Sequence, residues 1–561
     1  MSDLPTFDPP EPPKEPPKTS EFEDRVPDGL LSGWRLRSVT LSISLTLFLV
    51  NIEVSIVATS LVAIVDDLEG FNRVGWVVTS YLVTYTSLMI IWAKFSNALG
   101  RKTSMFCAVF LFAAFSGGCG GAQSMNQLII SRAFQGVGAA GCISVGFTIA
   151  YEMVAIHDYP KYAAIMTSLS ALGSLVGPLI GGALSENASW RWIFLINVPA
   201  ALLVCLLVLL SIPNGFPYHK QDNVSGNHQR SSQLTSPKSL DVLGAFLLLT
   251  ASMLLVTALL EAGVTFEWRS APTIVLFIIS GLLWIAFVLQ EFRLSKVKHT
   301  ATEPIFPWDF ITNKAWMGTL LLSMLSGAPY IVTMIDIPQR FETMGVGAFG
   351  AGARLIPFNL LIALGAVAVN IVAGKSKIPP IVLLTFGVIC QLVGVCLLST
   401  LDSSTSIPNA IYGYQVLTGL GIGVMFGLCV VLPPAVTKTK DLALCGGAVV
   451  QFRILGAALG LAVASTVWNN YVSSQFEQLL SSYQSSLVMK TTSAVFLLPE
   501  PQKQRVIEVL VHSYSLRMKV LIGFTAAQVI GLGMLWKRPQ ITFPRNETEL
   551  VEGMDMPGKS G

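Results

Sequence analysis

The sequence predicts an all-α polytopic membrane protein with about fourteen transmembrane helices. Hydrophobic residues make up 52% of its 561 residues, charged residues only 12%, and the mean hydropathy is +0.63. Soluble domains carry about 25% charged residues. Apolar runs long enough to span a bilayer, about 20 residues each, recur along the chain and provide the helices. The 36 Lys and Arg nearly balance the 33 Asp and Glu, for a net charge of +3, so nothing marks the chain as a nucleic-acid binder.

The first part of the chain divides into a tail, six apolar runs and a polar break. Residues 1–34 are rich in Pro, Glu and Lys, which predicts a disordered cytosolic tail and not a cleavable signal peptide. Residues 35–212 predict a six-helix bundle, with apolar runs near 39–63, 76–96, 104–122, 127–150, 163–184 and 193–212. Residues 213–240 are rich in Ser, Gln and Asn and predict a cytosolic loop.

Eight further apolar runs follow the polar break. Residues 241–292 predict two inserted helices, near 242–261 and 272–291. Residues 293–538 predict a second six-helix bundle, with runs near 316–336, 348–373, 379–400, 408–434, 443–467 and 518–536. Residues 468–516 are predicted to form an outer loop, because their apolar stretch is too short to cross a membrane. Residues 539–561 predict a second cytosolic tail.

An internal repeat supports two bundles of six helices. Glycines of the fourth and fifth runs match glycines of the twelfth and thirteenth at one offset, 283 residues (419 − 136). The matched pairs are Gly136 and Gly419, Gly138 and Gly421, Gly173 and Gly456, and Gly177 and Gly460. Duplicated halves around a midplane cavity are the architecture of alternating-access transporters. The alternative is that the helices of any polytopic protein share such spacing, since Gly is common in them.

The positions of Lys and Arg predict the orientation. Most basic residues of the short loops fall on one side of the predicted membrane, and positive residues resist translocation, so both termini are expected in the cytosol. Three glycosylation sequons begin at Asn187, Asn223 and Asn546. This topology places only Asn187 on the outer side, where it is a candidate for glycosylation.

Three charged residues lie at predicted membrane depth, where an ionised group is costly and normally faces a cavity or a partner. Glu53 and Arg132, in the first and fourth runs, lie at depths that let the long Arg side chain approach the carboxylate. Their movement relative to each other would let Glu53 load and release a proton, and a static buried ion pair is the alternative. Arg453 lies near the midplane and, with Gln451 and Gln415, is a candidate for the substrate cavity.

Two further groups are candidates for moving parts. Asp336 and Arg354 lie near the outer mouth of the second half, where they are expected to form an interfacial pair or outer gate. In the fifth run one helix face lacks side chains and permits close helix contact, and a proline there can bend the helix. The residues concerned are Gly173, Gly177, Pro178, Gly181 and Gly182. A plain close-packed interface is the alternative.

Several motifs carry a resemblance to a known family. Residues 128–140, which include Arg132 and Gln135, are similar to a fourth-span motif, and 173–182 to a fifth-span antiporter motif. Residues 190–199 resemble the entry to the sixth span, and Glu53 occupies the place of a first-span Asp. Over roughly 35–540 the chain resembles the major facilitator superfamily, specifically its fourteen-span drug:proton antiporters of fungal type. The resemblance implies a major facilitator fold and proton coupling at Glu53, Arg132 and Gln135.

The loop after the second run departs from the family pattern. The family usually carries Gly and Asp ahead of Gly-Arg-Lys, whereas this chain has Asn97 ahead of Gly100, Arg101 and Lys102. The resemblance implies an inner gate at these four residues. Asn97 cannot make the charge-assisted hydrogen bonds of a carboxylate, so a weaker latch is expected. Arg101 and Lys102 could equally serve only as topology signals.

The predicted function is proton-coupled efflux of amphipathic organic compounds, either a secondary metabolite or toxin or drugs, by alternating access. We expect a monomer in the plasma membrane whose partners are the substrate, protons and the lipid bilayer, with no cofactor beyond the proton gradient. The alternative is a vacuolar transporter of basic amino acids, or a siderophore transporter, on the same scaffold. An enzyme is not predicted, because the chain has no HExxH or GxSxG motif and no His cluster. All eight Cys lie in apolar runs without a CxxC pair, so neither disulfides nor a metal site is expected.

Overall fold

The computed structural model describes residues 30–541 with internal breaks. The breaks are 58–59, 61–63, 65–66, 69–73, 156–157, 217–240, 263–265, 297–303, 307, 377, 402–407, 438–441, 482–483, 486–487, 489–494, 496–497 and 539. The predictions made for the two tails and for most of the loop 213–240 fall outside the described residues.

The described helices follow the predicted order. The first half contains α1 (Gly33–Ile56), α3 (Val74–Ser87), α4 (Met89–Leu99), α5 (Arg101–Gly120), α6 (Met125–Glu152), α7 (Tyr159–Asn187), α8 (Trp192–Leu195) and α9 (Asn197–Ser211). Two helices, α10 (Val242–Glu261) and α11 (Ala271–Lys296), come next. The second half contains α12 (Trp308–Thr312), α13 (Lys314–Thr343), α14 (Ala348–Ala353), α15 (Ile356–Lys375), α16 (Pro380–Ser399), α17 (Ala410–Val431), α18 (Pro433–Val436), α19 (Leu442–Leu479) and α21 (Glu500–Leu535).

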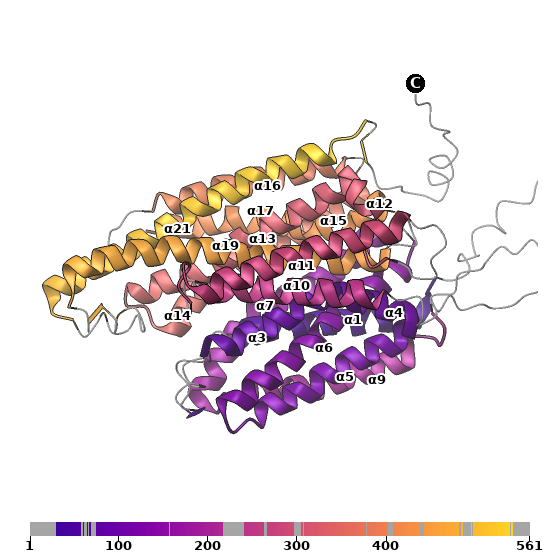
Figure 1. Ribbon diagram of the computed structural model, residues 1–561, viewed down its shortest axis with the longest axis horizontal. Coiled ribbons are helices and arrows are strands. Elements are labelled where there is room, and N and C mark those ends of the chain that lie inside the picture. Colours follow the sequence, from indigo (N-terminus) through magenta and orange to yellow (C-terminus); the bar gives the residue numbers. More distant parts are fainter. Residues whose placement is uncertain are drawn as a thin grey trace, which may run out of the picture.

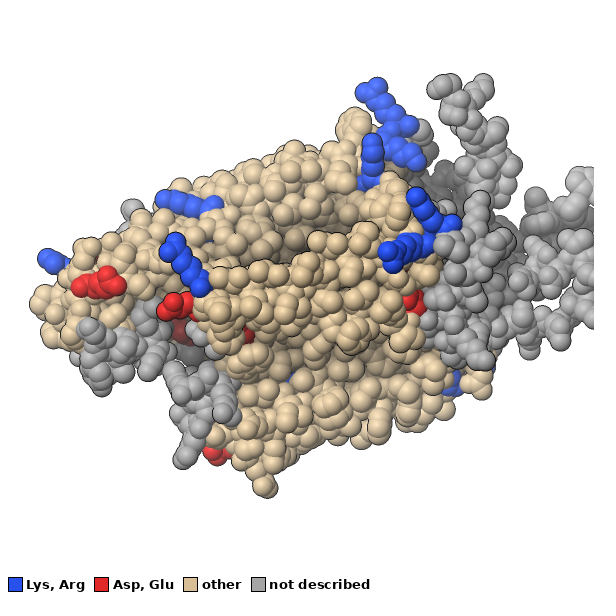
Figure 2. All heavy atoms as spheres, viewed as in Figure 1, with Lys and Arg blue, Asp and Glu red and all other residues tan. Residues whose placement is uncertain are grey.

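The helix lengths confirm the predicted membrane fold. Among the described residues, 13 helices are long and apolar enough to cross a membrane, and the pair α3 and α4, bent by 49°, provides a fourteenth span. On the face drawn in Figure 2, charged side chains gather toward the two ends of the molecule and leave a largely uncharged band between them. Such a band is what a bilayer requires.

The helices form two bundles with α10 and α11 beside them (Figure 1). We call the end at which α1 begins and α21 ends the terminal end, and the opposite end the far end. The inserted helix α10 contacts α3 of the first half and α19 of the second. It therefore packs along the boundary between the halves.

The repeated glycines occupy matching positions in the two bundles. In the first half, a carbon added at Gly136 of α6 would lie 2.5 Å from the carbonyl oxygen of Tyr81 on α3. A carbon added at Gly138 would lie 2.5 Å from the backbone nitrogen of Phe112 on α5. Because real side chains do not approach so closely, α6 can lie between α3 and α5 only with glycine at both positions.

The second half repeats this arrangement. An added carbon at Gly419 of α17 would lie 2.4 Å from the carbonyl oxygen of Phe358 on α15. The same addition at Gly421 would lie 2.5 Å from the backbone nitrogen of Gln391 on α16. The glycines related by the offset of 283 residues (419 − 136) thus allow the same close helix packing in both halves. This supports a structural repeat and not the alternative that glycine is merely common in membrane helices.

The predicted outer loop is shorter than expected. Within 468–516, α19 continues to Leu479 and α21 begins at Glu500, so most of this segment is helical. Phe476 of α19 packs with Val506 and Leu510 of α21 in a hydrophobic cluster of its own. Sequence periodicity missed these extensions because they are too polar to count as membrane spans. In Figure 1 they extend α19 and α21 beyond the rest of the far end.

The two halves are in contact at the terminal end. The hydroxyl of Tyr151 on α6 donates a 2.6 Å hydrogen bond to the carbonyl oxygen of Val430 on α17. An added carbon at Gly446 of α19 would lie 2.6 Å from the Phe147 side chain of α6. One hydrophobic core cluster continues across this boundary between the halves.

Candidate functional site

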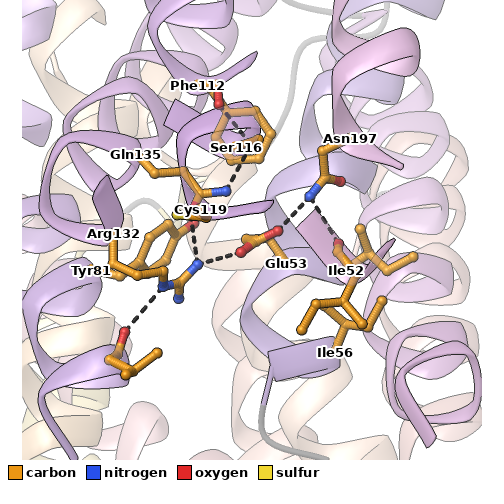
Figure 3. Close-up of polar contacts among 12 residues, drawn as sticks. Ile52, Glu53, Ile56, Tyr81, Phe112, Ser116, Cys119, Arg132, Gln135 and Asn197 are labelled. Carbon is orange, nitrogen blue, oxygen red and sulfur yellow. Dashed lines mark hydrogen bonds and ion pairs between the residues drawn. The ribbon is translucent and has the colours of Figure 1, made fainter. Parts of the chain in front are cut away.

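A buried polar cluster lies inside the first bundle, between helices that are apolar elsewhere (Figure 3). Glu53 comes from α1, Arg132 and Gln135 from α6, and Asn197 from the start of α9. All four side chains are at most 1% exposed. Arg132 and Gln135 are three positions apart, so they share one face of α6.

The carboxylate of Glu53 is held by donors from two other helices. Nη1 of Arg132 forms an ion pair and hydrogen bond with Oε1 of Glu53. Nδ2 of Asn197 donates to the other oxygen, Oε2. The structure therefore brings Glu53 and Arg132 together, as their expected depths suggested, and adds Asn197 as a partner.

The guanidinium of Arg132 is also fixed by its surroundings. Nε donates a 3.0 Å hydrogen bond to the carbonyl oxygen of Val77, and Nη1 donates a 2.7 Å bond to Oε1 of Gln135. The guanidinium lies over the ring of Tyr81, 4.2 Å from its centroid. Nε2 of Gln135 in turn donates a 2.8 Å bond to Oγ of Ser116 on α5. The cluster links five helices of the first half, α1, α3, α5, α6 and α9.

This geometry makes the charge state of Glu53 decisive for the cluster. An ionised Glu53 neutralises Arg132, whereas a protonated Glu53 would leave the buried guanidinium without a counter-charge. Breaking a buried ion pair by removing one charge costs about 3–5 kcal/mol. Protonation of Glu53 would therefore favour a rearrangement that brings the Arg132 guanidinium to another counter-charge or to water.

Asn197 is the residue of this cluster to which the sequence assigned no role. It stood within the motif at 190–199, and an amide side chain at the start of an apolar run was the available signal. Val77 contributes only its backbone carbonyl oxygen. Every residue type carries this group, so the sequence gives no signal for this contact.

The predicted inner gate is built around Arg101. Its guanidinium donates to both carboxylate oxygens of Glu152 at 2.6 and 2.8 Å, to Oγ of Ser96 at 2.6 Å and to Oδ1 of Asn97 at 2.6 Å. Asn97 thus serves as an acceptor, and Glu152, at the end of α6, supplies the carboxylate that position 97 lacks. The two-point Arg–carboxylate contact is a strong geometry, so the expectation of a weaker latch does not follow from Asn97 alone.

The other two gate residues have separate tasks. Gly100 links α4 to α5 with φ of 84°, a left-handed conformation that favours glycine. Lys102 lies at the surface and donates a 3.1 Å hydrogen bond to Oδ1 of Asn214. The structure therefore brings Asn97 and Arg101 together but not Lys102.

The glycine face of α7 packs against α1, the helix that carries Glu53. An added carbon would lie 2.6 Å from the carbonyl oxygen of Phe48 at Gly173, and 2.0 Å from Oγ of Ser55 at Gly177. The carbonyl oxygen of Gly181 accepts a 3.4 Å hydrogen bond from Ser60, and Pro178 lies inside the helix. Gly182 lies in α7 as well, whereas the Asn187 side chain is outside the described part of the chain.

A cavity of about 170 Å³ lies between the two halves. Helices of both halves line it, and α10 contributes Val256 and Leu260. Among the predicted cavity residues, Arg453 of α19 lines this space, whereas Gln451 and Gln415 do not. Both glutamines are buried. Their prediction as cavity residues was wrong, because polarity within an apolar run does not fix which way a side chain faces.

The predicted pair of Asp336 and Arg354 is also wrong. Asp336 of α13 instead forms a 2.9 Å ion pair with Nη1 of Arg517 on α21. Arg354, between α14 and α15, places its guanidinium 5.3 Å from the ring centroid of Phe341. The sequence placed the last span at 518–536, which left Arg517 one residue outside it and out of consideration.

Comparisons with known proteins agree with this architecture. Residues 43–289 match the family model described as Major Facilitator Superfamily. The chain is 38% identical over 508 residues to the MFS-type transporter FPY5 of Fusarium mangiferae, covering 90% of this chain and 84% of that protein. The chain belongs to the major facilitator superfamily.

Other relatives and structures of this superfamily extend the comparison. The MFS thioclapurine efflux transporter tcpA of Claviceps purpurea is 27% identical over 528 residues, covering 92% of this chain and 94% of that protein. An inward-facing, unoccupied bacterial homologue of the human lysosomal transporter Spinster superposes with a TM-score of 0.57 at 15% identity. That match covers 90% of this chain and all of the homologue, so it shows a shared fold. The predicted resemblance to fungal exporters of the major facilitator superfamily is confirmed.

Proposed function

We propose that this member of the major facilitator superfamily is a proton-coupled exporter of amphipathic organic compounds. The observation that carries the proposal is the buried ion pair of Glu53 and Arg132, together with a cavity between two repeated halves. The relatives described above include a named efflux transporter of a fungal metabolite. Export of a secondary metabolite or toxin from the cytosol is the activity that fits these features together.

Proton binding at Glu53 is the proposed driving step. Protonation removes the negative charge that faces Arg132, and the cluster then favours a different packing of α1 against α6 and α9. Because Gly173 and Gly177 place α7 in direct backbone contact with α1, a shift of α1 displaces a helix that lines the cavity. The proton is released when Arg132 returns to the carboxylate.

Alternating access requires that one end of the halves opens while the other closes. In this structure the terminal end is closed, with Tyr151 of α6 bonded to Val430 of α17 and Gly446 of α19 packed against Phe147 of α6. The excess of basic residues in the short loops supports a cytosolic position for this end. The proposal therefore assigns both termini to the cytosolic side of the plasma membrane, with these contacts separating when the substrate enters.

The cavity also bears on the alternative of a basic amino-acid transporter. Among its described lining residues Arg453 is the charged one, and no carboxylate accompanies it. A cationic substrate would meet an uncompensated like charge, which costs several kcal/mol at low dielectric. The lining thus favours export of neutral or acidic compounds over uptake of basic amino acids.

The test uses the full chain in proteoliposomes with an imposed pH gradient. Proton-driven transport is measured for 2-naphthoate, its amide and the cation ethidium, by the native chain and by Glu53→Gln. We expect at least one probe to be transported by the native chain and the variant to lose gradient-driven transport. The exposed Glu500→Gln is the matched control, since Glu500 lies at the surface and pairs there with Lys503.

Two results would contradict the proposal. One is gradient-driven transport by Glu53→Gln at the native rate. The other is movement of the probes down their own concentration gradients that ignores the pH gradient in the native chain.

A further inference from the structure

Arg453 differs from Arg132, Arg101 and Arg517 in having no carboxylate partner among the described residues. Arg132, Arg101 and Arg517 each pair with an acidic side chain, as described above. For Arg453 the structure describes no hydrogen bond and no ion pair with any residue. A cation at membrane depth without a counter-charge is costly and normally marks a functional site.

Aromatic rings compensate only part of this cost. The guanidinium lies over the ring of Phe426, 4.2 Å from its centroid. Its other electrostatic neighbours are the phenols of Tyr85 and Tyr330 and the thiol of Cys429. Cation–π contacts contribute far less than a buried ion pair in a dry site. The surroundings of Arg453 therefore tolerate the cation without neutralising it.

The accessible part of Arg453 faces the cavity between the halves. Arg453 is partly exposed, and it lines the cavity together with Phe426, Tyr85 and Tyr330. The rest of the lining is largely aliphatic, with hydroxyl groups on α7 and two amide side chains, from Thr167, Ser170, Ser174, Asn51 and Asn359. The cavity thus combines one cation, aromatic faces and apolar walls.

The repeat shows that this cation is particular to one half. With the offset of 283 residues, Arg453 corresponds to Ser170 (453 − 283), and both line the cavity. The fold therefore accommodates an uncharged side chain at this place, and no packing requirement for an arginine follows from the repeat. The charge has to be explained by what enters the cavity.

We propose that Arg453 binds the acidic group of the substrate, and that this transporter exports organic anions with an aromatic or conjugated body. The anion would be a carboxylate, enolate or phenolate whose oxygens accept hydrogen bonds from the guanidinium. A cavity of about 170 Å³ exceeds the space of about 150 Å³ that holds one benzene ring, so the ring-bearing part of such a compound fits. This inference rests on the proposed export function for the meaning of the cavity.

Equilibrium binding tests the inference separately from transport. Calorimetric titration of the purified full chain with 2-naphthoate and with 2-naphthamide compares an anion with its neutral analogue of the same shape. We expect the native chain to bind the anion at least about tenfold more tightly, a preference lost in Arg453→Gln and largely kept in Arg453→Lys. Arg505→Gln, which removes an exposed arginine of α21, is the matched control and should keep the preference.

Binding of 2-naphthamide by Arg453→Gln would show that the variant retains a folded cavity. Equal affinity for anion and amide in the native chain would overturn the inference, as would absence of anion binding or an unchanged preference in Arg453→Gln. These results are distinct from failure of the export proposal, which is read from gradient-driven transport. A chain that prefers the anion but ignores the pH gradient would sustain Arg453 as the anion site and reject proton coupling.

Discussion

Arg132 reaches from α6 to the carboxylate of Glu53 on α1, 79 positions earlier in the chain, while Asn197 of α9 occupies the second carboxylate oxygen. Both oxygens of one buried acid are thus used by different helices. A change in the charge of Glu53 therefore alters a hydrogen bond to α6 and a hydrogen bond to α9 at the same time. This acid thus connects three helices of the first bundle.

Substitution of Arg132 should destabilise the protein more than simultaneous neutralisation of both partners. Arg132→Gln leaves Glu53 ionised and buried, with an expected loss of about 3–5 kcal/mol. In the double variant Glu53→Gln with Arg132→Gln, neither buried side chain is charged, so part of the lost stability should return. Gradient-driven transport should not return. Thermal unfolding in detergent and proteoliposome transport measure the two effects. Equal unfolding temperatures for the single and double variants would reject the pair as an energetic unit.

The close contact of α19 with α13 predicts a strong effect of one added methyl group. A carbon at Gly456 would lie 1.7 Å from the carbonyl oxygen of Met324, so Gly456→Ala should push the two helices apart. We expect loss of transport and a lower unfolding temperature, with a cost of about 1–3 kcal/mol or more. Gly523→Ala on α21 is the matched control, because nothing lies within 4 Å of its added carbon. Similar behaviour of the two variants would show that helix contact at Gly456 is unimportant.

The Arg101 gate predicts rescue between two positions. Glu152→Gln removes the two-point carboxylate contact, which joins the start of α5 to the end of α6, and should lower the unfolding temperature. Adding Asn97→Asp in that background places a carboxylate on the side chain that already bonds to Arg101 at 2.6 Å, so part of the lost stability should return. Thermal unfolding in detergent measures both changes. A double variant that unfolds at the temperature of Glu152→Gln alone would contradict a shared latch.

Asp67 predicts a pH-dependent contact at the far end. Hydrogen bonds from Arg191 and from Trp190 lower the pKa of Asp67 below its ordinary value. Its contribution to stability is therefore present above the ordinary Asp range, about 3.9, and is lost as pH falls through the lowered pKa. Because the pair is largely exposed, the effect is small. The difference in unfolding temperature between the native chain and Asp67→Asn should shrink from pH 7 to pH 3, and a constant difference would exclude this role.

The sequence predicted most of the fold because a membrane helix can be recognised from the length and the apolar composition of a single run of residues. The fourteen spans, the inserted pair and the repeated glycines all follow from local apolar runs. The helical extensions of α19 and α21 could not be predicted in this way, since they lie in the segment 468–516 that is too polar to cross a bilayer.

The sequence predicted the contacts that depend only on the depth of a residue in the membrane. It did not predict the contacts that depend on the direction in which a side chain points. Glu53 and Arg132 lie at matching depths, and so they meet. Gln415 and Asp336 have the right polarity, but their neighbours depend on the rotation of each helix about its axis and on the packing of distant segments. Arg517, the partner of Asp336, belongs to a helix whose start the apolar pattern misplaced.

The lone guanidinium of Arg453 has a consequence for the membrane voltage. If one proton enters while one monovalent anion leaves, both movements carry positive charge inward, two elementary charges per cycle. Each charge adds about 2.3 kcal/mol per 100 mV of inside-negative potential. An exporter of a neutral compound would gain from one such charge and an exporter of a monovalent cation from none. If Arg453 binds the anion as proposed, the side chain at position 453 sets how strongly the electrical potential, in addition to the proton concentration, drives export of the substrate.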